Sequence, residues 1–129
     1  MVARHWVPNT MPDARTCAKE WVAAWNAHDL DQIMAHYAAD VILEAQTVVS
    51  RWKKPDGRLV GKEELRKHFA LGLQLSPQLK FTIEDIFLAP SGYALLYRRE
   101  NGNRAIEAVT LNNEGLATRV TVYYLGAQA

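Results

Sequence analysis

The stretch from Trp21 to Ala45, WVAAWNAHDLDQIMAHYAADVILEA, constrains the fold more than any other part of the chain. Apolar residues recur at helical spacing over residues 12–28 and again over residues 30–39, which predicts two helices. Asp29 lies between them and suits the N-cap of the second. A short β-rich run after Asp40 predicts a strand. The connections are short, so these elements must lie close together, and we expect the rest of the chain to close a pocket around them.

Two tryptophans mark the first predicted helix. Trp21 and Trp25 lie four residues apart and therefore share one helix face. An aromatic stripe of this kind ordinarily packs in a protein core, where each ring buries a large apolar area. The alternative is that one indole N–H points into a cavity and donates a hydrogen bond to a ligand. The sequence leaves both interpretations open.

The later segments predict one more helix and several strands. Residues 62–73, KEELRKHFALGL, carry an apolar stripe and acidic residues at their start, which indicates a third helix. Residues 46–52, QTVVSRW, are rich in β-branched side chains and predict a short strand or an extended rim. Residues 53–61 contain a Pro-Asp-Gly turn. Two β-rich arms flank Glu100–Asn103, a strong hairpin signal, and residues 117–126 predict the last strand.

The composition limits the class of protein. The chain has 129 residues, of which 49% are hydrophobic and 22% charged, which is typical of a single globular domain over residues 1–129. Residues 1–11 are predicted to be a flexible or capping arm. The net charge of +1 provides no electrostatic footprint for nucleic acid. No apolar run is long enough for a membrane span, and the start of the chain has no signal-peptide core. We expect neither a nucleic-acid nor a membrane partner.

Metal and cofactor sites are not predicted. The four histidines, His5, His28, His36 and His68, lie on different segments without chelating spacing. Glycine-rich phosphate loops, paired CxxC, HExxH and GxSxG motifs do not occur. The single cysteine, Cys17, cannot form an internal disulfide and suits a reducing cytoplasm, where we expect the protein to act.

The segment WNAHDLDQIMAHYAADVILEA resembles the signature of the SnoaL-like branch of the nuclear transport factor 2-like superfamily, which includes relatives of ketosteroid isomerase and polyketide cyclase. The resemblance is carried by Trp25, Asn26, Asp29, Leu30, Asp31, Asp40 and Val41. The later stretch GKEELRKHF resembles the third helix of the family. No single motif is exclusive to the superfamily, but their combination over most of the chain is specific.

The resemblance implies an α+β fold: a cone-shaped α+β barrel in which three helices of the N-terminal half pack on a strongly curved, mainly antiparallel sheet. It also implies a homodimer. We expect the valine face of the last strand to point inward and the face carrying Arg119 to form the outer, dimeric side. The superfamily contains isomerases, cyclases, dehydratases, hydrolases and non-catalytic binders, so its fold does not determine function.

The resemblance also implies roles for individual positions. In the isomerases of this superfamily, a carboxylate late in the first strand is the general base, and an acid on a later strand forms an oxyanion hole with a tyrosine of the first helix. The base position falls on Ala45 and the tyrosine position on Trp21, whereas Glu107 matches the oxyanion acid. Tyr37 matches a supporting ring, and His68 matches a position that lines the pocket. The missing base argues against steroid-type isomerisation by the usual route.

Glu44 as a replacement base and an epoxide-hydrolase function are two further alternatives, and the sequence favours neither. Glu44 directly precedes Ala45, and adjacent strand residues point to opposite faces, so only a bulge would turn Glu44 toward the cavity. The epoxide-hydrolase type of the same superfamily needs an Asp–Arg–Asp set. The last strand has Thr121-Val122-Tyr123 where the second aspartate should stand.

Glu107 is the candidate acid. Its neighbours at alternate spacing, Ala105 and Val109, are apolar, so its side chain is expected to leave the strand on a buried face. A buried carboxyl without a partner has a raised pKa and can donate a hydrogen bond to a ligand carbonyl or act as an acid or base near neutral pH. Tyr97 lies on the facing arm of the hairpin, within reach. The alternative is a structural ion pair with Arg98, Arg99 or Arg104.

Two functions are therefore open. The first is a pocket for a small, mostly apolar ligand with a carbonyl or hydroxyl group, with cofactor-free isomerase, cyclase or dehydratase chemistry. Glu107 would then be the acid or oxyanion donor, His68 a proton carrier, and the walls would be Trp21, Trp25, Tyr37, Tyr97 and Tyr124. The second is a non-catalytic binding or dimerisation module that has lost the general base. Ala45 favours the second function, and the isolated Glu107 favours the first.

Overall fold

The computed structural model describes residues 13–125, so the arm predicted over residues 1–11 lies outside the described part. The elements follow in the order α1 (Ala14–Asn26), α2 (Leu30–Met34), β1 (Tyr37–Glu44), α3 (Gln46–Trp52), β2 (Arg58–Val60), α4 (Lys62–Leu75), β3 (Phe81–Ala89), β4 (Gly92–Arg99), β5 (Arg104–Leu111) and β6 (Ala117–Tyr124). None of the described helices has the length and apolarity to cross a bilayer.

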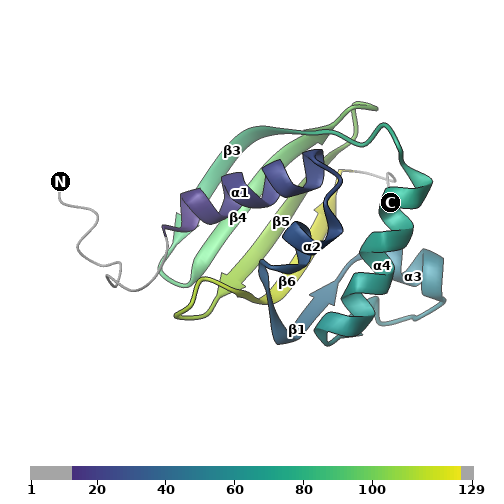
Figure 1. The fold of residues 1–129 in the computed structure, drawn as a ribbon, viewed down its shortest axis with the longest axis horizontal. Helices are drawn as coiled ribbons and strands as arrows, with labels where there is room; N and C mark the ends of the chain where they lie inside the picture. The colour runs from purple at the N-terminus through teal and green to yellow at the C-terminus, as the bar shows by residue number, and fades with distance from the viewer. Residues whose placement is uncertain (1–12, 126–129) are drawn as a thin grey trace.

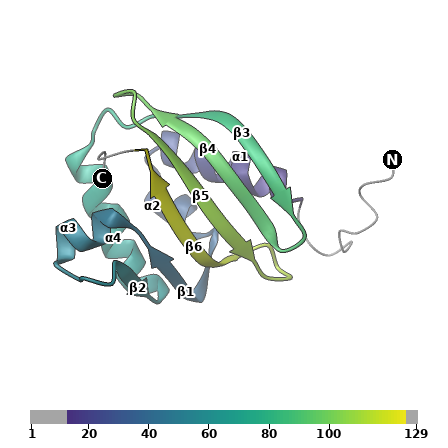
Figure 2. The same ribbon diagram turned by 180° about the vertical axis from the view of Figure 1, so that it is seen from behind.

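The strands form one six-stranded sheet in the order β2-β1-β6-β5-β4-β3. All neighbours pair antiparallel except β1 and β6, which pair parallel. Helices α1, α2 and α4 lie on one face of the curved sheet, and the view from behind shows β3 to β6 with no helix in front of them (Figures 1 and 2). The predicted α+β class is confirmed. The sheet is mixed and does not close, and the described residues form four helices instead of three.

Two side chains at the end of α1 attach this helix to the edge of the sheet. The Asn26 side-chain amide donates to the Phe81 carbonyl at 2.9 Å and accepts from the Phe81 N–H at 2.7 Å. His28 adopts a left-handed backbone conformation with φ 55°, and its Nε2 lies 2.8 Å from the Leu79 carbonyl oxygen. These contacts join the turn after α1 to the start of β3, which closes one side of the space under the sheet.

The second predicted helix is shorter than its pattern suggests. The prediction covered residues 30–39, but α2 ends at Met34 and β1 begins at Tyr37. The Ala117 N–H donates to the His36 carbonyl at 2.8 Å, and Tyr37 pairs with Ala117 of β6. Pairing with a distant strand therefore overrides the local helical pattern, because helix propensity is a weak preference that tertiary contacts override.

The prediction of a short strand or an extended rim for QTVVSRW is wrong, because these residues form α3. Ala45 precedes the helix in an extended conformation, and Lys53 ends it in the left-handed region at φ 54° and ψ 42°. Val48 is completely buried and anchors the helix against the core. Helical spacing then places Thr47 and Arg51 on one face, toward the space between α4 and the sheet.

The strands around the hairpin have the predicted arrangement. β4 and β5 pair across the Asn-Gly turn, with Leu95 opposite Glu107. On β6, Val120 is 1% exposed and Tyr123 is 58% exposed, so the valine face points inward and the opposite face outward, as predicted. Gly92 begins β4 so close to β5 that a Cβ at this position would lie 1.9 Å from the Val109 carbonyl oxygen. This position therefore requires glycine.

Candidate functional site

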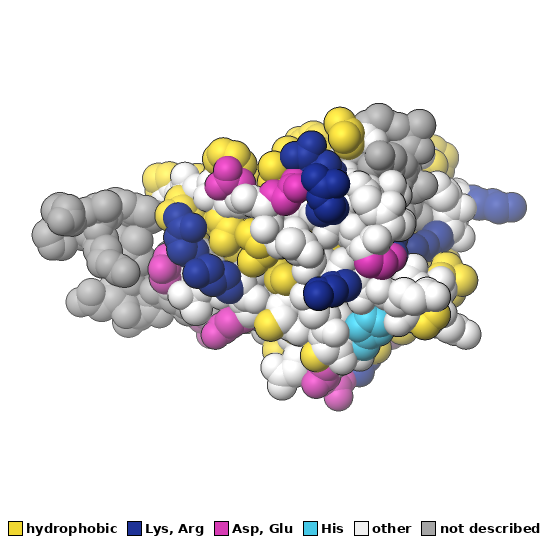
Figure 3. All heavy atoms as spheres, turned by 90° about the horizontal axis from the view of Figure 1, so that it is seen from above, with side chains coloured by type: hydrophobic (Ala, Val, Ile, Leu, Met, Phe, Trp, Pro, Cys, Tyr) yellow, Lys and Arg dark blue, Asp and Glu magenta, His cyan; other side chains and the backbone are white. Residues whose placement is uncertain are grey.

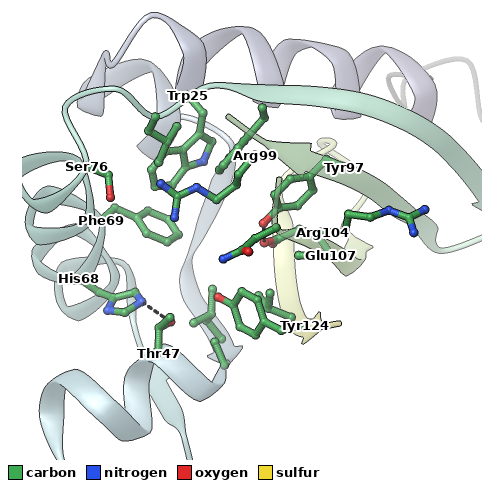
Figure 4. Close-up of a pocket in the computed structure, with 18 of the residues that line it drawn as sticks. Trp25, Thr47, His68, Phe69, Ser76, Tyr97, Arg99, Arg104, Glu107 and Tyr124 are labelled. Atoms are coloured by element: carbon green, nitrogen blue, oxygen red, sulfur yellow. Dashed lines mark hydrogen bonds between the residues drawn. The ribbon is translucent and has the colours of Figure 1, made fainter. Parts of the chain in front are cut away.

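A cavity of about 280 Å³ lies under the curved sheet, between helices α1, α3 and α4 and strands β1, β3, β4, β5 and β6. Its apolar walls include Trp21, Trp25, Leu43, Phe69, Phe81 and Val122. Its polar walls include Thr47, Arg51, His68, Tyr97, Arg99, Arg104, Glu107 and Tyr124. Figure 4 shows these polar groups arriving from opposite sides: His68 and Thr47 from the helices, and Tyr97, Glu107 and Tyr124 from the strands. The cavity suits a small molecule that is mostly apolar with a few acceptor groups.

The apolar part of the cavity is an aromatic cluster. Trp21 stacks on Phe81 with ring centroids 5.5 Å apart, and Phe81 lies 4.4 Å from Tyr97. Trp25 meets Phe69 edge to face at 4.9 Å. Aromatic pairs at such distances add to the stability provided by burial alone. The cluster therefore forms a rigid wall, and both predicted roles of the tryptophans, core packing and cavity lining, are compatible with it.

Glu107 is a buried acid with a single hydrogen-bond partner among the described residues. It lies on the buried face of β5 together with Ala105 and Val109, and it is 7% exposed. The Tyr97 hydroxyl donates to its Oε2 at 3.0 Å. Burial raises the pKa of Glu107 to about 7, and the Tyr97 hydrogen bond opposes this shift. At neutral pH a large fraction of Glu107 therefore carries a proton, which its second oxygen can donate to a ligand.

The hairpin arginines considered as ion-pair partners of Glu107 pair with other acids. Arg98 and Arg104 both contact Glu84, at 2.8 and 2.7 Å. Arg99 contacts Glu100 at 3.1 Å. A bulge in β3 between Ile83 and Asp85 shifts the register near Glu84. Each of these three arginines therefore pairs with an acid other than Glu107, and the Glu107 carboxyl faces the cavity.

His68 belongs to a chain of hydrogen bonds with a fixed direction. The Trp52 indole N–H donates to His68 Nδ1 at 2.9 Å, so the proton of the neutral ring lies on Nε2. Nε2 lies 3.3 Å from the Thr47 hydroxyl, which in turn hydrogen-bonds Tyr124. Burial and the nearby Arg51 lower the pKa of His68 to about 4. A second ring proton would displace the Trp52 bond, so this geometry disfavours His68 as a proton carrier.

Two buried donors at the cavity have no acceptor among the described residues. They are Trp25 Nε1 and Arg99 Nε. Trp25 is 6% exposed, and Figure 4 shows its ring beside the Arg99 side chain. The other cavity tryptophan is already satisfied, because Trp21 Nε1 donates to the Tyr37 hydroxyl at 2.7 Å. A buried donor without a partner destabilises the folded protein, and a hydrogen bond to a ligand acceptor would offset this cost.

Six of the seven predicted site residues line the cavity: Trp21, Trp25, His68, Tyr97, Glu107 and Tyr124. Tyr37 does not; it lies behind Trp21 and is 2% exposed. Ala45 lines the cavity, whereas Glu44 contacts Arg58 at 3.8 Å on the outside, as the strand alternation predicted. Thr47 and Arg51 were missed because their segment was predicted as a strand. A helical interpretation of QTVVSRW would have placed both on one face.

Charges outside the cavity are mixed. On the face shown in Figure 3, acidic and basic side chains are interspersed. Among residues 13–125, no three His, Cys, Asp or Glu side chains come together in a way that could hold a metal ion. Cys17 is 6% exposed, and burial is the main cause that raises the pKa of its thiol, which suits a core residue.

A cavity roofed by a bent, open sheet and floored by helices defines a cone-shaped α+β protein. Residues 18–124 match the SnoaL-like domain, and the chain belongs to this family. A search of curated proteins finds no match.

Solved structures with the same fold extend the comparison. A SnoaL-like protein of unknown function from Burkholderia thailandensis is 31% identical, with a TM-score of 0.84 over 88% of this chain and 94% of that one. RV0760c from Mycobacterium tuberculosis, solved in complex with estradiol-17β-hemisuccinate, is 22% identical, with a TM-score of 0.67 over 87% and 93%. A protein of unknown function from Cytophaga hutchinsonii is 16% identical, with a TM-score of 0.67 over 92% and 95%.

Proposed function

We propose that the protein binds a small, mostly apolar ligand in the cavity and that protonated Glu107 donates a hydrogen bond to a carbonyl or hydroxyl oxygen of this ligand. The observation that carries the proposal is Glu107 itself, a 7% exposed acid that faces an aromatic cavity and whose one hydrogen-bond partner in the described part of the chain is Tyr97. Tyr97 holds one carboxyl oxygen and leaves the other for the ligand. The complex of RV0760c with a steroid derivative supports small-molecule binding in this fold.

If the protein is an enzyme, Glu107 supplies acid chemistry without a cofactor. A hydrogen bond from Glu107 to a carbonyl oxygen stabilises negative charge that develops there during isomerisation, cyclisation or dehydration. A pKa of about 7 also suits proton transfer near neutral pH. In this role the aromatic wall excludes water and orients the apolar part of the ligand.

A non-catalytic binding module is the second candidate, and two observations favour it. Ala45 lines the cavity at the position where the resembled isomerases carry their base. His68 is held neutral with its Nδ1 occupied by Trp52, so it does not provide a second proton-transfer group. Among the described lining residues, Glu107 is then the only acid, and turnover would need a base that the ligand or solvent supplies.

The proposal is tested with the neutral ketone 2-acetylnaphthalene as a probe. Because the donor is the protonated form of Glu107, we expect affinity to be constant at low pH and to fall as pH rises above about 7. In Glu107→Gln, whose amide does not titrate in this range, affinity should not change with pH. Calorimetric titrations over this range, with the Glu107 pKa measured by carboxyl NMR, check both points. An ordinary Glu107 pKa, together with affinity that Glu107→Gln leaves untouched, would reduce Glu107 to a scaffold residue.

We also propose that the protein forms a homodimer through the outer face of the sheet. Leu96, Ile106 and Tyr123 occupy one row across β4, β5 and β6 on this face, and Tyr123 is 58% exposed. Tyr123→Glu is expected to shift the dimer toward the monomer, because it places a charge in an apolar contact. Sedimentation equilibrium measures the shift, and Leu75→Glu, at an equally exposed position of α4, is the matched control. A Tyr123→Glu protein as dimeric as the control contradicts the proposed interface.

A cytoplasmic location remains a prediction from the single cysteine.

A further inference from the structure

Two arginines from different elements converge on the cavity. Arg51 comes from α3 and Arg99 from the end of β4, and both line it. The Nη1 of Arg51 lies beside Gly72 of α4, where an added Cβ would approach it to 3.3 Å. Burial, with the nearby charge of Arg99 as a further cause, lowers the pKa of the Arg51 guanidinium. Two positive charges thus share one partly enclosed space, an arrangement that is unfavourable without an anion.

The two arginines differ in their ion pairs with acidic residues of the described chain. Arg51 makes no ion pair with any acid of residues 13–125. Arg99 forms an ion pair through its Nη2 with Glu100. The Glu100 carboxylate also accepts a hydrogen bond from the Lys80 N–H at 3.0 Å. This leaves Arg99 Nε and the neighbouring Trp25 Nε1 as buried donors for which residues 13–125 provide no acceptor. This end of the cavity therefore has excess positive charge and buried N–H groups that can donate to a ligand.

We propose that the ligand is an amphipathic organic acid whose carboxylate is bound by Arg51 and Arg99, with Trp25 Nε1 as an additional donor. A carboxylate matches this set, because its two oxygens accept several hydrogen bonds and guanidinium groups bind it in a planar, two-point geometry. The rest of the ligand lies on the aromatic wall formed by Trp25, Phe69 and Phe81. An inorganic anion would leave that wall unused.

This inference rests on the proposed function and adds a second recognition point to it. Tyr124 is close to both points, because the charges of Glu107, Arg51 and Arg99 all act on the pKa of its hydroxyl. Arg99 lies beside Trp25, whereas Glu107 lies beside Tyr97 and accepts its hydrogen bond (Figure 4). The ligand therefore has its carboxylate at the arginine end and its carbonyl or hydroxyl group further along, near Glu107.

The test compares 2-naphthoate with 2-acetylnaphthalene, which has the same ring and carbonyl but no charge. At about pH 6, where Glu107 keeps its proton, calorimetry is expected to show naphthoate binding roughly tenfold more tightly or better. Arg51→Gln should weaken naphthoate binding roughly tenfold to hundredfold and leave ketone binding nearly unchanged. Arg99→Gln should act in the same direction. Arg15→Gln, at an exposed position of α1 that does not line the cavity, is the matched control and should change neither.

A second measurement does not depend on the variants folding. In the wild-type protein labelled with ¹⁵N, naphthoate should shift the Nε–H resonance of Arg99 and the indole resonance of Trp25 more than the ketone does. Equal affinity for the two compounds, or parallel losses of both in Arg51→Gln, overturns the acid-binding inference. If the ketone affinity still falls as Glu107 loses its proton, the proposed function is supported even though the acid-binding inference fails. Binding of neither compound contradicts both proposals.

Discussion

Glu107→Gln is expected to stabilise the protein at about pH 8 by about 3 kcal/mol and to leave its stability at about pH 4 nearly unchanged. The folded-state pKa of Glu107 is raised to about 7 from an ordinary 4.5. The folded protein therefore holds a proton that the unfolded chain releases, so this stabilising contribution is complete below about pH 4.5 and is lost as pH rises through about 7. Glutamine keeps the shape and the hydrogen bond to Tyr97 but does not ionise.

His68 is expected to change the free energy of unfolding with pH in the opposite direction to Glu107. Its folded-state pKa is lowered to about 4 from 6.5, so the unfolded chain binds a proton that the folded protein does not. This term destabilises the protein as pH falls from about 6.5 to about 4, by about 2 to 3 kcal/mol in total. Between about pH 4.5 and 6.5 the two terms nearly cancel in the wild-type protein. Stability should rise with pH across this interval in Glu107→Gln and fall with pH in His68→Asn.

Urea unfolding at a series of pH values measures these slopes. Differences between each variant and the wild-type protein remove the background from other acids, such as Glu84, whose pKa is lowered by its hydrogen bonds to Arg98 and Arg104. Glu44→Gln, on the exterior, is the control for loss of a carboxylate and should follow the wild-type curve. Parallel curves for Glu107→Gln and the wild-type protein would mean that Glu107 titrates like an exposed glutamate.

Gly92→Ala is expected to lower the free energy of unfolding by about 3 to 5 kcal/mol, a large part of the stability of an ordinary domain. The added Cβ would lie 1.9 Å from the Val109 carbonyl oxygen and 2.9 Å from its carbonyl carbon. Both are backbone atoms of the paired strand β5, so relief requires β4 and β5 to move apart. Because Glu107 lies two residues before Val109 on β5, we also expect a change at the cavity. Chemical denaturation measures the loss.

Gly102→Ala is the matched control in the turn of the same hairpin. Gly102 has φ 89°, and a Cβ there would meet nothing within 4 Å. The only penalty is the left-handed backbone conformation, which costs about 1 kcal/mol for alanine. If Gly92→Ala proved no more destabilising than Gly102→Ala, this result would contradict the inference that β4 and β5 approach too closely at Gly92 to admit a Cβ.

Much of the fold follows from local pattern in the sequence. Helical spacing around Trp21 and along residues 62–73, and the Asn-Gly turn before Asn103, predicted elements that the structure contains. The burial of Glu107 followed from its apolar neighbours two residues away on either side. These features depend on residues close in the chain, where periodicity is informative.

The errors arise where distant segments decide the local structure. β1 begins at Tyr37 because β6 pairs with it from 80 residues further along. Residues 46–52 form α3 despite their β-branched side chains, because Val48 is buried against the core. That error removed Thr47 and Arg51 from the predicted site. Likewise, local pattern does not show that Trp25 has no acceptor among the described residues, because this depends on the segments packed around it.

The Trp52 side chain lies 40% exposed, and Trp52 is not among the residues that line the cavity. Its indole can only donate, so it sets the order of donors and acceptors for His68, Thr47 and Tyr124 in turn. The Tyr124 hydroxyl at the end of this series accepts from Thr47, and no acceptor within residues 13–125 takes its own hydrogen, which can be donated to a ligand. The cavity therefore presents donors to an acceptor atom of a ligand, and the order of these donors is set by Trp52, which does not line the cavity.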